Sequence, residues 1–419
     1  MPLLRSWVDS ANSHACPFPL NNLPCGVFST ADTPPRCGVA IGDRIVDMFA
    51  LEAAGVVKLS DAPLFAEASW NAVMAAGPAV WGALREALIG LLSEGSAKRE
   101  VVEPHLVQIA DAQMHLPFRV AGYTDFYASR QHAFNVGTMF RGPENAIPPN
   151  WLHIPIGYNG RASSVVVSGT AVRRPWGQVK APDEPAPRFA PSARFDIELE
   201  LGAVVGTGSV DPVTVSEADA MIFGYVLLND WSARDIQAWE YQPLGPFQGK
   251  ATATTIGAWI VTRAALEPFR TEGPVREKAL LPYLEEPGPM LYAINLEVGL
   301  TPAAGEETVV SRTSYREMYY SAAQQLAHHT TAGCRMDVGD LLGTGTISGP
   351  DAGSYGSLLE LSWGGKQPIR LDDGEQRSFL EDGDAVALRG WCEGDGYRIG
   401  FGDCEGRILP AHADPYRRG

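Results

Sequence analysis

The chain has 419 residues, of which 45% are hydrophobic and 20% are charged, and it contains 44 glycines and 32 prolines. This length exceeds one ordinary hydrophobic core and predicts two domains, and the glycine and proline content favours many short strands over long helical bundles. A formal net charge of −16 argues against nucleic acid as a partner, because phosphates would be repelled.

The cysteines and the apolar stretches indicate the compartment. Six cysteines are scattered with no CxxC pair, which argues against a zinc knuckle or a redox motif and favours reduced thiols. The first twelve residues contain no continuous apolar segment of the kind found in secretory signals. The longest apolar stretch, 221–228, is too short to span a bilayer. We therefore expect a cytoplasmic protein that does not bind membranes.

Residues 1–117 are predicted to form the first domain. Short strands are expected at 26–28 and 36–48, followed by a helix that ends at Gly95. The apolar residues that share one face of that helix are Trp81, Leu84, Leu88, Leu91 and Leu92. No cluster of titratable residues occurs in this part of the sequence, so we expect a small, supporting, β-barrel-like domain.

Residues 118–419 are predicted to form a larger, mainly β domain, which gives an α+β chain overall. Strands are expected at 164–167, 193–205, 221–228, 259–262 and 291–300. The proline-rich segment 180–191 is predicted to be an exposed loop, and residues 314–329 are predicted to form a helix. This larger domain holds the residues with chemical potential.

Acidic and apolar residues alternate in the segment 195–201. At a period of two, Asp196, Glu198 and Glu200 share one face of a strand. One interpretation is a surface strand with a solvated acidic face. The other is a cation site, because two glutamates on one face repel each other unless a cation lies between them.

Two further acids strengthen the metal hypothesis. Asp230 follows a buried apolar strand directly, and Asp125 lies in an aromatic segment, Tyr123 to Tyr127. Carboxylates without cysteine or paired histidine ligands suit a hard cation such as Ca²⁺ or Mg²⁺.

Cationic and polar residues follow Asp230. Arg234, Gln237 and Tyr241 fall on one stripe of a short predicted helix, for which Ser232 has the position of an N-cap. The alternative is an ordinary polar helix surface. Lys250 adds a second cationic donor farther along the chain.

His132 is the remaining chemical candidate among the eight histidines, although a lone histidine is more often structural than catalytic. His328 and His329 are adjacent at a predicted helix C-terminus. There the helix dipole favours them, and their side chains diverge.

Several long segments resemble the fumarylacetoacetate hydrolase family in the same order along nearly the whole chain. The matching segments are 125–127, 132–137, 160–170, 229–241, 243–247, 345–350 and 359–363. The resemblance implies an SH3-like N-terminal barrel, a β-sandwich roll that carries catalysis, and a homodimer.

The resemblance also implies a role for each matching residue. Asp125, Glu198, Glu200 and Asp230 match the ligands of the catalytic Ca²⁺ or Mg²⁺, and a second Mg²⁺ is implied near Asp230, Lys250 and Thr254. His132 matches the general base and Glu360 the acid that orients it, while Arg234, Gln237 and Lys250 match donors around the reacting oxygen. The matching substrate contacts are Tyr127, Arg141, Tyr158, Tyr241 and Thr346.

The implied substrate is a small diketo acid. The implied reaction is metal-dependent hydrolysis of the carbon–carbon bond of 4-fumarylacetoacetate to fumarate and acetoacetate, the last step of tyrosine and phenylalanine catabolism. Two rival interpretations are decarboxylation or tautomerisation of a keto acid at the same metal site, and a non-catalytic metal-binding protein.

Three residues depart from the family pattern. Ala253 stands where glycine is usual, and it would strain the second-cation loop if that position needs a positive φ. Phe134 replaces a common threonine and Asn159 a common histidine, and both are expected at the edge of the pocket.

Overall fold

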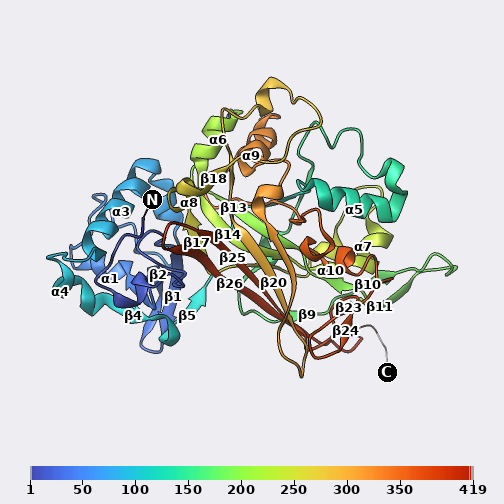
Figure 1. The fold of residues 1–419 in the computed structure, drawn as a ribbon, viewed down its shortest axis with the longest axis horizontal. Helices are drawn as coiled ribbons and strands as arrows, with labels where there is room; N and C mark the ends of the chain where they lie inside the picture. The colour runs from blue at the N-terminus through green and yellow to red at the C-terminus, as the bar shows by residue number, and fades with distance from the viewer. Residues whose placement is uncertain (1, 415, 417–419) are drawn as a thin grey trace.

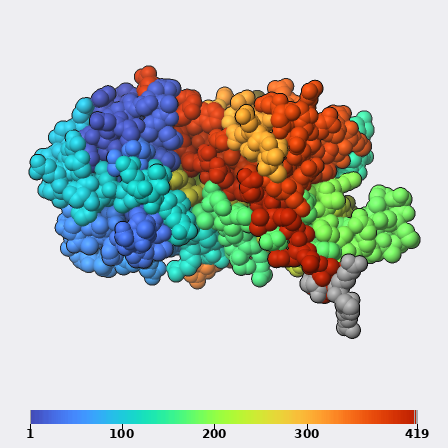
Figure 2. Space-filling view, turned by 90° about the horizontal axis from the view of Figure 1, so that it is seen from below, coloured from blue at the N-terminus to red at the C-terminus, as the bar shows by residue number. Residues whose placement is uncertain are grey.

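The computed structural model describes residues 2–414 and Tyr416 and shows a sheet-rich α+β protein. Figure 1 shows the N-terminal residues, in blue, at one end of the molecule, and the long C-terminal strands β25 and β26 crossing the central strands β13 and β14. In Figure 2 the same N-terminal residues fill one end, and the red C-terminal residues lie against the green middle of the chain.

The largest sheet has 13 strands, most of them along the path β4-β3-β2-β1-β17-β14-β13-β22-β6-β7. Its strands are β1 (Cys25–Thr30), β2 (Thr33–Ile41), β3 (Arg44–Asp47), β4 (Leu106–Gln108), β5 (Gln113–His115), β6 (Tyr123–Phe126), β7 (Gly157–Asn159), β8 (Val165–Val167), β13 (Leu199–Val205), β14 (Ile222–Asp230), β16 (Thr254–Ile256), β17 (Trp259–Thr262) and β22 (Leu341–Gly343). The predicted strands at 26–28, 36–48, 164–167, 221–228 and 259–262 all lie in this sheet.

Four helices surround the N-terminal strands: α1 (Met48–Ala53), α2 (Asn71–Ala75), α3 (Pro78–Leu92) and α4 (Arg99–Val102). Helix α3 confirms the predicted helix. Pro78 occupies its first turn, where a missing N–H costs nothing, and Leu84, Leu88 and Leu92 are its buried residues, one turn apart.

The N-terminal strands continue directly into the sheet of the larger region. β1 pairs antiparallel with β17, with Cys25 opposite Ile260 and Gly26 opposite Trp259. The two regions also share an apolar core, in which the ring of Phe223 on β14 stacks on Trp70 at a centroid distance of 6.3 Å and meets the edge of Trp81 at 5.1 Å. Hydrogen bonds and aromatic packing therefore attach the N-terminal region to a central strand.

A second sheet covers the central strands. Its order is β21-β20-β25-β26-β9, formed by β21 (Thr308–Ser314), β20 (Asn295–Thr301), β25 (Ala385–Glu393), β26 (Arg398–Leu409) and β9 (Val172–Arg173). Leu227 of β14, Leu296 of β20 and Leu388 of β25 belong to one buried cluster between the two sheets. A Cβ added at Gly390 would lie 3.0 Å from the Leu227 side chain, so these backbones approach closely. Both faces of the central strands are thus buried.

The remaining strands form two-stranded sheets: β10 (Trp176–Val179) with β11 (Arg188–Pro191), β12 (Phe195–Asp196) with β15 (Ser232–Ala233), β18 (Arg270–Thr271) with β19 (Leu291–Tyr292), and β23 (Ile369–Arg370) with β24 (Gln376–Arg377). The remaining α-helices are α5 (Arg130–Arg141), α6 (Val215–Met221), α7 (Arg234–Glu240), α8 (Arg263–Leu266), α9 (Ala322–Thr330) and α10 (Leu358–Leu361). Within residues 2–414 and Tyr416, no helix is long and apolar enough to cross a membrane.

Two predicted elements are wrong in part. The helix expected at 314–329 begins only at Ala322, because Ser321 forms the N-cap and completes a capping box with Gln324, whereas Ser314 ends strand β21. The segment 180–191 is not a loop throughout, since β10 and β11 pair as a hairpin with Trp176 opposite Pro191. A two-stranded ribbon accepts proline because each strand has an edge where no N–H is needed.

Candidate active site

Four buried carboxylates lie together at one end of the central strands. Asp125 lies on β6, Glu200 on β13 and Asp230 at the end of β14, while Glu198 precedes β13 directly. Because β6, β22, β13 and β14 are neighbours in the sheet, these positions converge, and one ligand atom from each lies within 4.8 Å of the others. The four predicted metal ligands therefore form one cluster.

The charges of this cluster are incompletely balanced by the protein. Asp125 Oδ1 and Glu200 Oε1 are buried and have no hydrogen-bond partner. Burial, together with the neighbouring carboxylates, raises the pKa of Asp125 and of Glu200 well above the usual carboxyl range. A Cβ at Gly343 would lie 2.4 Å from Asp125 Oδ1, so only glycine leaves the cluster room there. Orphaned carboxylate oxygens in a buried cluster fit a divalent cation.

Glu198 is the member of the cluster with cationic neighbours. Its Oε1 accepts from Arg234 Nη1 at 2.8 Å, and its Oε2 accepts from the Lys250 ammonium. Burial would raise its pKa, but Lys250 and Arg234 outweigh that effect and lower the pKa of Glu198 to about 2. Lys250 Nζ also donates to Asp230 Oδ2 at 2.8 Å. Glu198 is therefore ionised at every pH at which the protein would be studied.

The interpretation of segment 195–201 as a solvated acidic face is wrong, because Asp196, Glu198 and Glu200 are all buried. They also do not share one environment, since β12 ends at Asp196 and β13 begins at Leu199. Asp196 instead accepts from Arg234 Nε at 2.8 Å and from the backbone N–H groups of Leu358 and Leu359. Asp196 thus holds the guanidinium that contacts Glu198.

Helix α7 carries the predicted polar stripe but not the predicted cap. Arg234, Gln237 and Tyr241 all line one cavity, and Arg234 Nη1 lies 3.3 Å from Gln237 Oε1. Ser232 is not the N-cap, because it belongs to strand β15 and its hydroxyl donates to the carbonyl of Asp230. Arg234 Nη2 is buried without a partner, which leaves one strong donor unused.

His132 and Glu360 form a buried pair beside the carboxylate cluster. Ser129 caps helix α5 by accepting from the His132 N–H, which fixes the start of the helix that carries the histidine. His132 Nδ1 and Glu360 Oε2 are 2.7 Å apart. Burial would raise the pKa of Glu360, but His132 and three further donors lower it, so Glu360 is an ionised acceptor. The Nδ1 atom therefore carries the proton, and Nε2 is the free base.

The supports of this pair are residues that the sequence analysis missed. Asn135 Nδ2 donates to Glu360 Oε1 at 2.9 Å, while the hydroxyls of Ser348 and Ser357 donate to Oε2 at 2.9 and 2.8 Å. Asn135 lies one helical turn from His132, a spacing that could have indicated a shared face. Nothing in the local sequence points from Ser348 to Glu360.

The cluster and the histidine open into a common cavity of about 410 Å³. Every predicted substrate contact lines it, namely Tyr127, Arg141, Tyr158, Gln237, Tyr241 and Thr346. Asp125, His132, Glu198, Arg234 and Lys250 also reach its surface, whereas Glu200, Asp230, Thr254 and Glu360 lie behind it. Thr346 Oγ1 is buried without a partner, and the Tyr158 hydroxyl donates to Asp230 Oδ2 at 2.8 Å.

Arg141 lies at the rim of this cavity, at the end of helix α5. Its Nε and Nη2 donate to the carbonyls of Asn145 and Ala146 at 3.1 and 2.7 Å. These bonds fix the orientation of the guanidinium while leaving its charge without a carboxylate partner among the described residues.

The departures from the family pattern have small structural consequences. Ala253 does not adopt a positive φ, which in the described part of the chain is confined, outside glycine, to Leu23 and Trp363. The strain considered for this position is therefore absent. Thr254 Oγ1 donates to Asp230 Oδ1 at 3.3 Å beside it. Phe134 and Asn159 do not line the cavity, contrary to expectation, and the Arg130 guanidinium covers the Phe134 ring at 5.7 Å.

The comparisons with known proteins agree with this geometry. Residues 122–409 match the family model described as fumarylacetoacetate (FAA) hydrolase, C-terminal, and residues 21–117 match the model described as fumarylacetoacetase, N-terminal. Fumarylacetoacetase of Dictyostelium discoideum is 48% identical, with 98% of this chain and 99% of the relative covered. The human enzyme is 48% identical over 94% and 96%, and that of Arabidopsis thaliana is 47% identical over 98% and 100%.

Solved structures show the same fold at much lower identity. A fumarylacetoacetate hydrolase from Exiguobacterium antarcticum matches with a TM-score of 0.54 and 17% identity, and covers 93% of this chain and 100% of its own. Since two family models together match most of the chain and several relatives are nearly half identical over almost their whole length, this chain is a member of the fumarylacetoacetate hydrolase family.

Proposed function

We propose that this chain hydrolyses the carbon–carbon bond of 4-fumarylacetoacetate to fumarate and acetoacetate, the reaction that ends tyrosine and phenylalanine breakdown. The relatives named fumarylacetoacetase support the substrate. The observation that carries the proposal is the meeting of a buried four-carboxylate cluster with the His132–Glu360 pair in one cavity. A protein that only binds metal would not need a histidine held in one tautomer.

The cation of this proposal is Ca²⁺ or Mg²⁺, held by Asp125, Glu198, Glu200 and Asp230. All-oxygen ligation is supported by the residue types and by the two orphaned carboxylate oxygens. When bound, such a cation polarises the carbonyl under attack and stabilises the enolate that leaves. A second Mg²⁺ near Lys250 and Thr254 belongs to the same proposal. The Lys250 ammonium is not a ligand for it, so backbone oxygens would take that role.

His132 is the proposed general base. The ionised Glu360 keeps the proton on Nδ1, so Nε2 can take a proton from a water molecule in the cavity. The hydroxide equivalent adds to the polarised carbonyl. The same imidazole, now protonated, can return the proton to the leaving carbon, which balances the proton over the reaction.

Arg234, Gln237 and Lys250 are the proposed donors to the oxygen that becomes negative when water adds. Arg234 Nη2 supports this role because it is a buried donor without a partner. Asp196 holds the guanidinium through Nε, so the donor is oriented before substrate arrives. The proposed contacts of the substrate itself are Tyr127, Arg141, Tyr158, Tyr241 and Thr346.

The finer architecture is part of the proposal. We assign residues 1–117 to an SH3-like N-terminal barrel and residues 118–419 to a β-sandwich roll that carries the site, in a cytoplasmic homodimer. The pairing of β1 with β2, β5 and β17 and the packing of two sheets over a common core support this division of the fold.

Hydrolysis is tested by incubating the protein with fumarylacetoacetate and following the loss of diketone absorbance, with and without a chelator. Fumarate and acetoacetate should form in equal amounts, and only with divalent metal present. Loss of absorbance without fumarate would instead indicate isomerisation or decarboxylation, and would overturn the proposal.

A further inference from the structure

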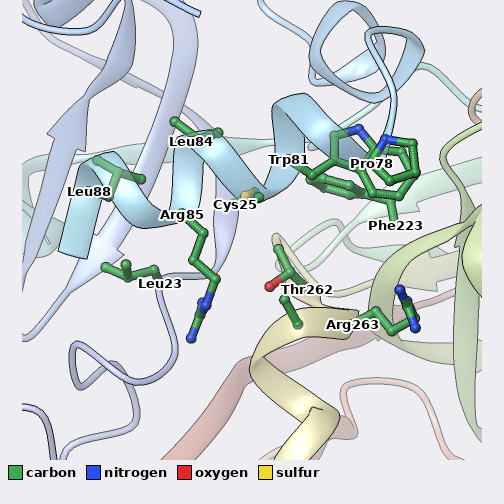
Figure 3. Close-up of a pocket in the computed structure, with 12 residues that line it drawn as sticks. Leu23, Cys25, Pro78, Trp81, Leu84, Arg85, Leu88, Phe223, Thr262 and Arg263 are labelled. Carbon is green, nitrogen blue, oxygen red and sulfur yellow. The ribbon is translucent and has the colours of Figure 1, made fainter. Parts of the chain in front are cut away.

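A second cavity, of about 250 Å³, lies away from the carboxylate cluster, where helix α3 faces strands β14 and β17 and helix α8 (Figure 3). Most of its surface is apolar. Trp81, Pro78 and Phe223 gather at one end, and Leu84 and Leu88 project from the next turns of α3. None of the residues that line it lines the cavity of the candidate active site.

Arg85 gives this apolar cavity a positive charge. Figure 3 shows its side chain extending from α3 into the space between Leu23 and Thr262. Its Nη1 and Nη2 donate to the backbone carbonyls of Asn22 and Asn21. A guanidinium has five N–H donors, so three of them remain.

The charge of Arg85 is not neutralised by a carboxylate. Its polar contacts within the described residues are those two carbonyls, and desolvation lowers its pKa. Arg263, at the other side of the cavity, is paired with Asp219 at 2.9 Å. In a chain with a net charge of −16, a half-buried arginine without an acidic partner is a site for an anion.

We propose that this cavity binds a small carboxylate with an aromatic body, the carboxylate on Arg85 and the ring between Trp81, Leu84, Leu88 and Phe223. The size agrees, because a cavity of about 150 Å³ lined by apolar side chains holds benzene. The remaining 100 Å³ of the 250 Å³ leaves space for a carboxylate and a linking carbon. The site does not depend on the proposed hydrolysis.

Two glycines of helix α3 provide a matched test. Gly82 lines the cavity and Gly90 does not, and a Cβ at either position would meet no atom within 4 Å. Leucine at either position removes a helix-destabilising glycine, so both variants are expected to fold. Gly82→Leu fills part of the cavity, whereas Gly90→Leu places the same side chain outside it.

Phenylacetate is the probe, and its dissociation constant is measured by calorimetry on the full chain. We expect Gly82→Leu to weaken binding ten-fold or more and Gly90→Leu to change it less than two-fold. Equal affinity in the original protein and both variants would mean that phenylacetate binds elsewhere, such as in the active site, and would overturn the proposal.

The role of the charge is tested with Arg85→Met. Because a hydrogen bond to a charged group contributes about 1.5–3 kcal/mol, phenylacetate should bind about ten-fold more weakly or worse, while neutral benzyl alcohol should bind equally to both proteins. Arg85→Met also loses the bonds to Asn21 and Asn22, so its melting temperature is recorded. If that variant does not fold, the glycine pair decides. Undiminished phenylacetate binding by folded Arg85→Met would overturn the assignment of the anion.

Discussion

His132 Nδ1 lies 2.7 Å from Glu360 Oε2, although 228 positions separate the two residues in the chain. Helix α5 brings the histidine and the short helix α10 brings the glutamate. Asn135, Ser348 and Ser357 occupy the remaining acceptor sites of the carboxylate. A carboxylate with four donors stays ionised and fixed in orientation, which fixes the ring of its histidine partner.

We predict that His132→Ala lowers kcat by roughly 10²- to 10⁴-fold, the usual contribution of a general base. Metal affinity should change little, because His132 is not a member of the carboxylate cluster. Glu360→Gln should cost less, since it disturbs the tautomer and leaves the imidazole in place. Steady-state rates and metal titration measure both effects. Loss of metal from either variant would assign these residues to the wrong role.

Removal of divalent metal should abolish turnover and preserve the fold, because the apolar core does not include the four carboxylates. Glu198→Gln should weaken metal binding and leave the circular dichroism spectrum unchanged. Lys250 keeps Asp230 as a partner and Arg234 keeps Asp196, so neither buried cation is left unpaired. Glu144→Gln, at an exposed position, is the matched control. Full activity in a verified metal-free sample would refute metal dependence.

The metal-free protein should respond to pH through Asp125 and Glu200. Burial and neighbouring carboxylates raise their pKa values in the folded state, while in the unfolded chain these groups titrate near their usual values of about 4. Their contribution to stability is therefore complete below the unfolded pKa and is lost as pH rises toward the folded pKa. Glu198, with a pKa of about 2, contributes no change over this range.

A bound divalent cation removes this loss, because both carboxylates then ionise without repelling each other. We expect the rise in melting temperature on adding metal to be larger at pH 8 than at pH 5.5, where protons compete for the same oxygens. Calorimetric scans with and without metal at both pH values measure it. An equal rise at both would mean that these carboxylates do not hold the ion.

Arg141→Met should raise KM for the acid substrate about ten-fold or more, because a charge-assisted hydrogen bond is worth about 1.5–3 kcal/mol. A neutral ester analogue should be almost unaffected. Arginine pairs bidentately with a carboxylate, so Arg141→Lys should not restore the KM. Since Arg141 also holds the carbonyls of Asn145 and Ala146, an equal loss for acid and ester would show that it supports the loop instead.

The sequence was sufficient for the four carboxylates and for most strands of the large sheet, because each depends on residue types and on a local period. It was not sufficient for the environment of segment 195–201. Alternation normally indicates one solvated face, but a second sheet covers the central strands, and Asp196 turns to Arg234. The helix expected at 314–329 was too long because Ser321, rather than Ser314, offers the capping box.

The supports of the histidine pair could not be predicted from local pattern at all. Ser348 meets Glu360 only through tertiary packing, and Asn135 becomes informative only once its helix is placed beside α10. Contacts of this kind depend on the whole topology, which propensity and period do not encode.

The pairing of β1 with β17 makes the N-terminal region a cover for an edge. Without residues 1–117, the backbone N–H and C=O groups of β17 that now bond to Cys25 and Gly26 would face solvent as an open strand, and the aromatic ring of Phe223 would lose Trp70 and Trp81. Open strands recruit other strands, from any chain that offers one. A shortened chain should therefore be sticky before it is inactive, and insolubility rather than lost chemistry should be the first sign of damage at this junction.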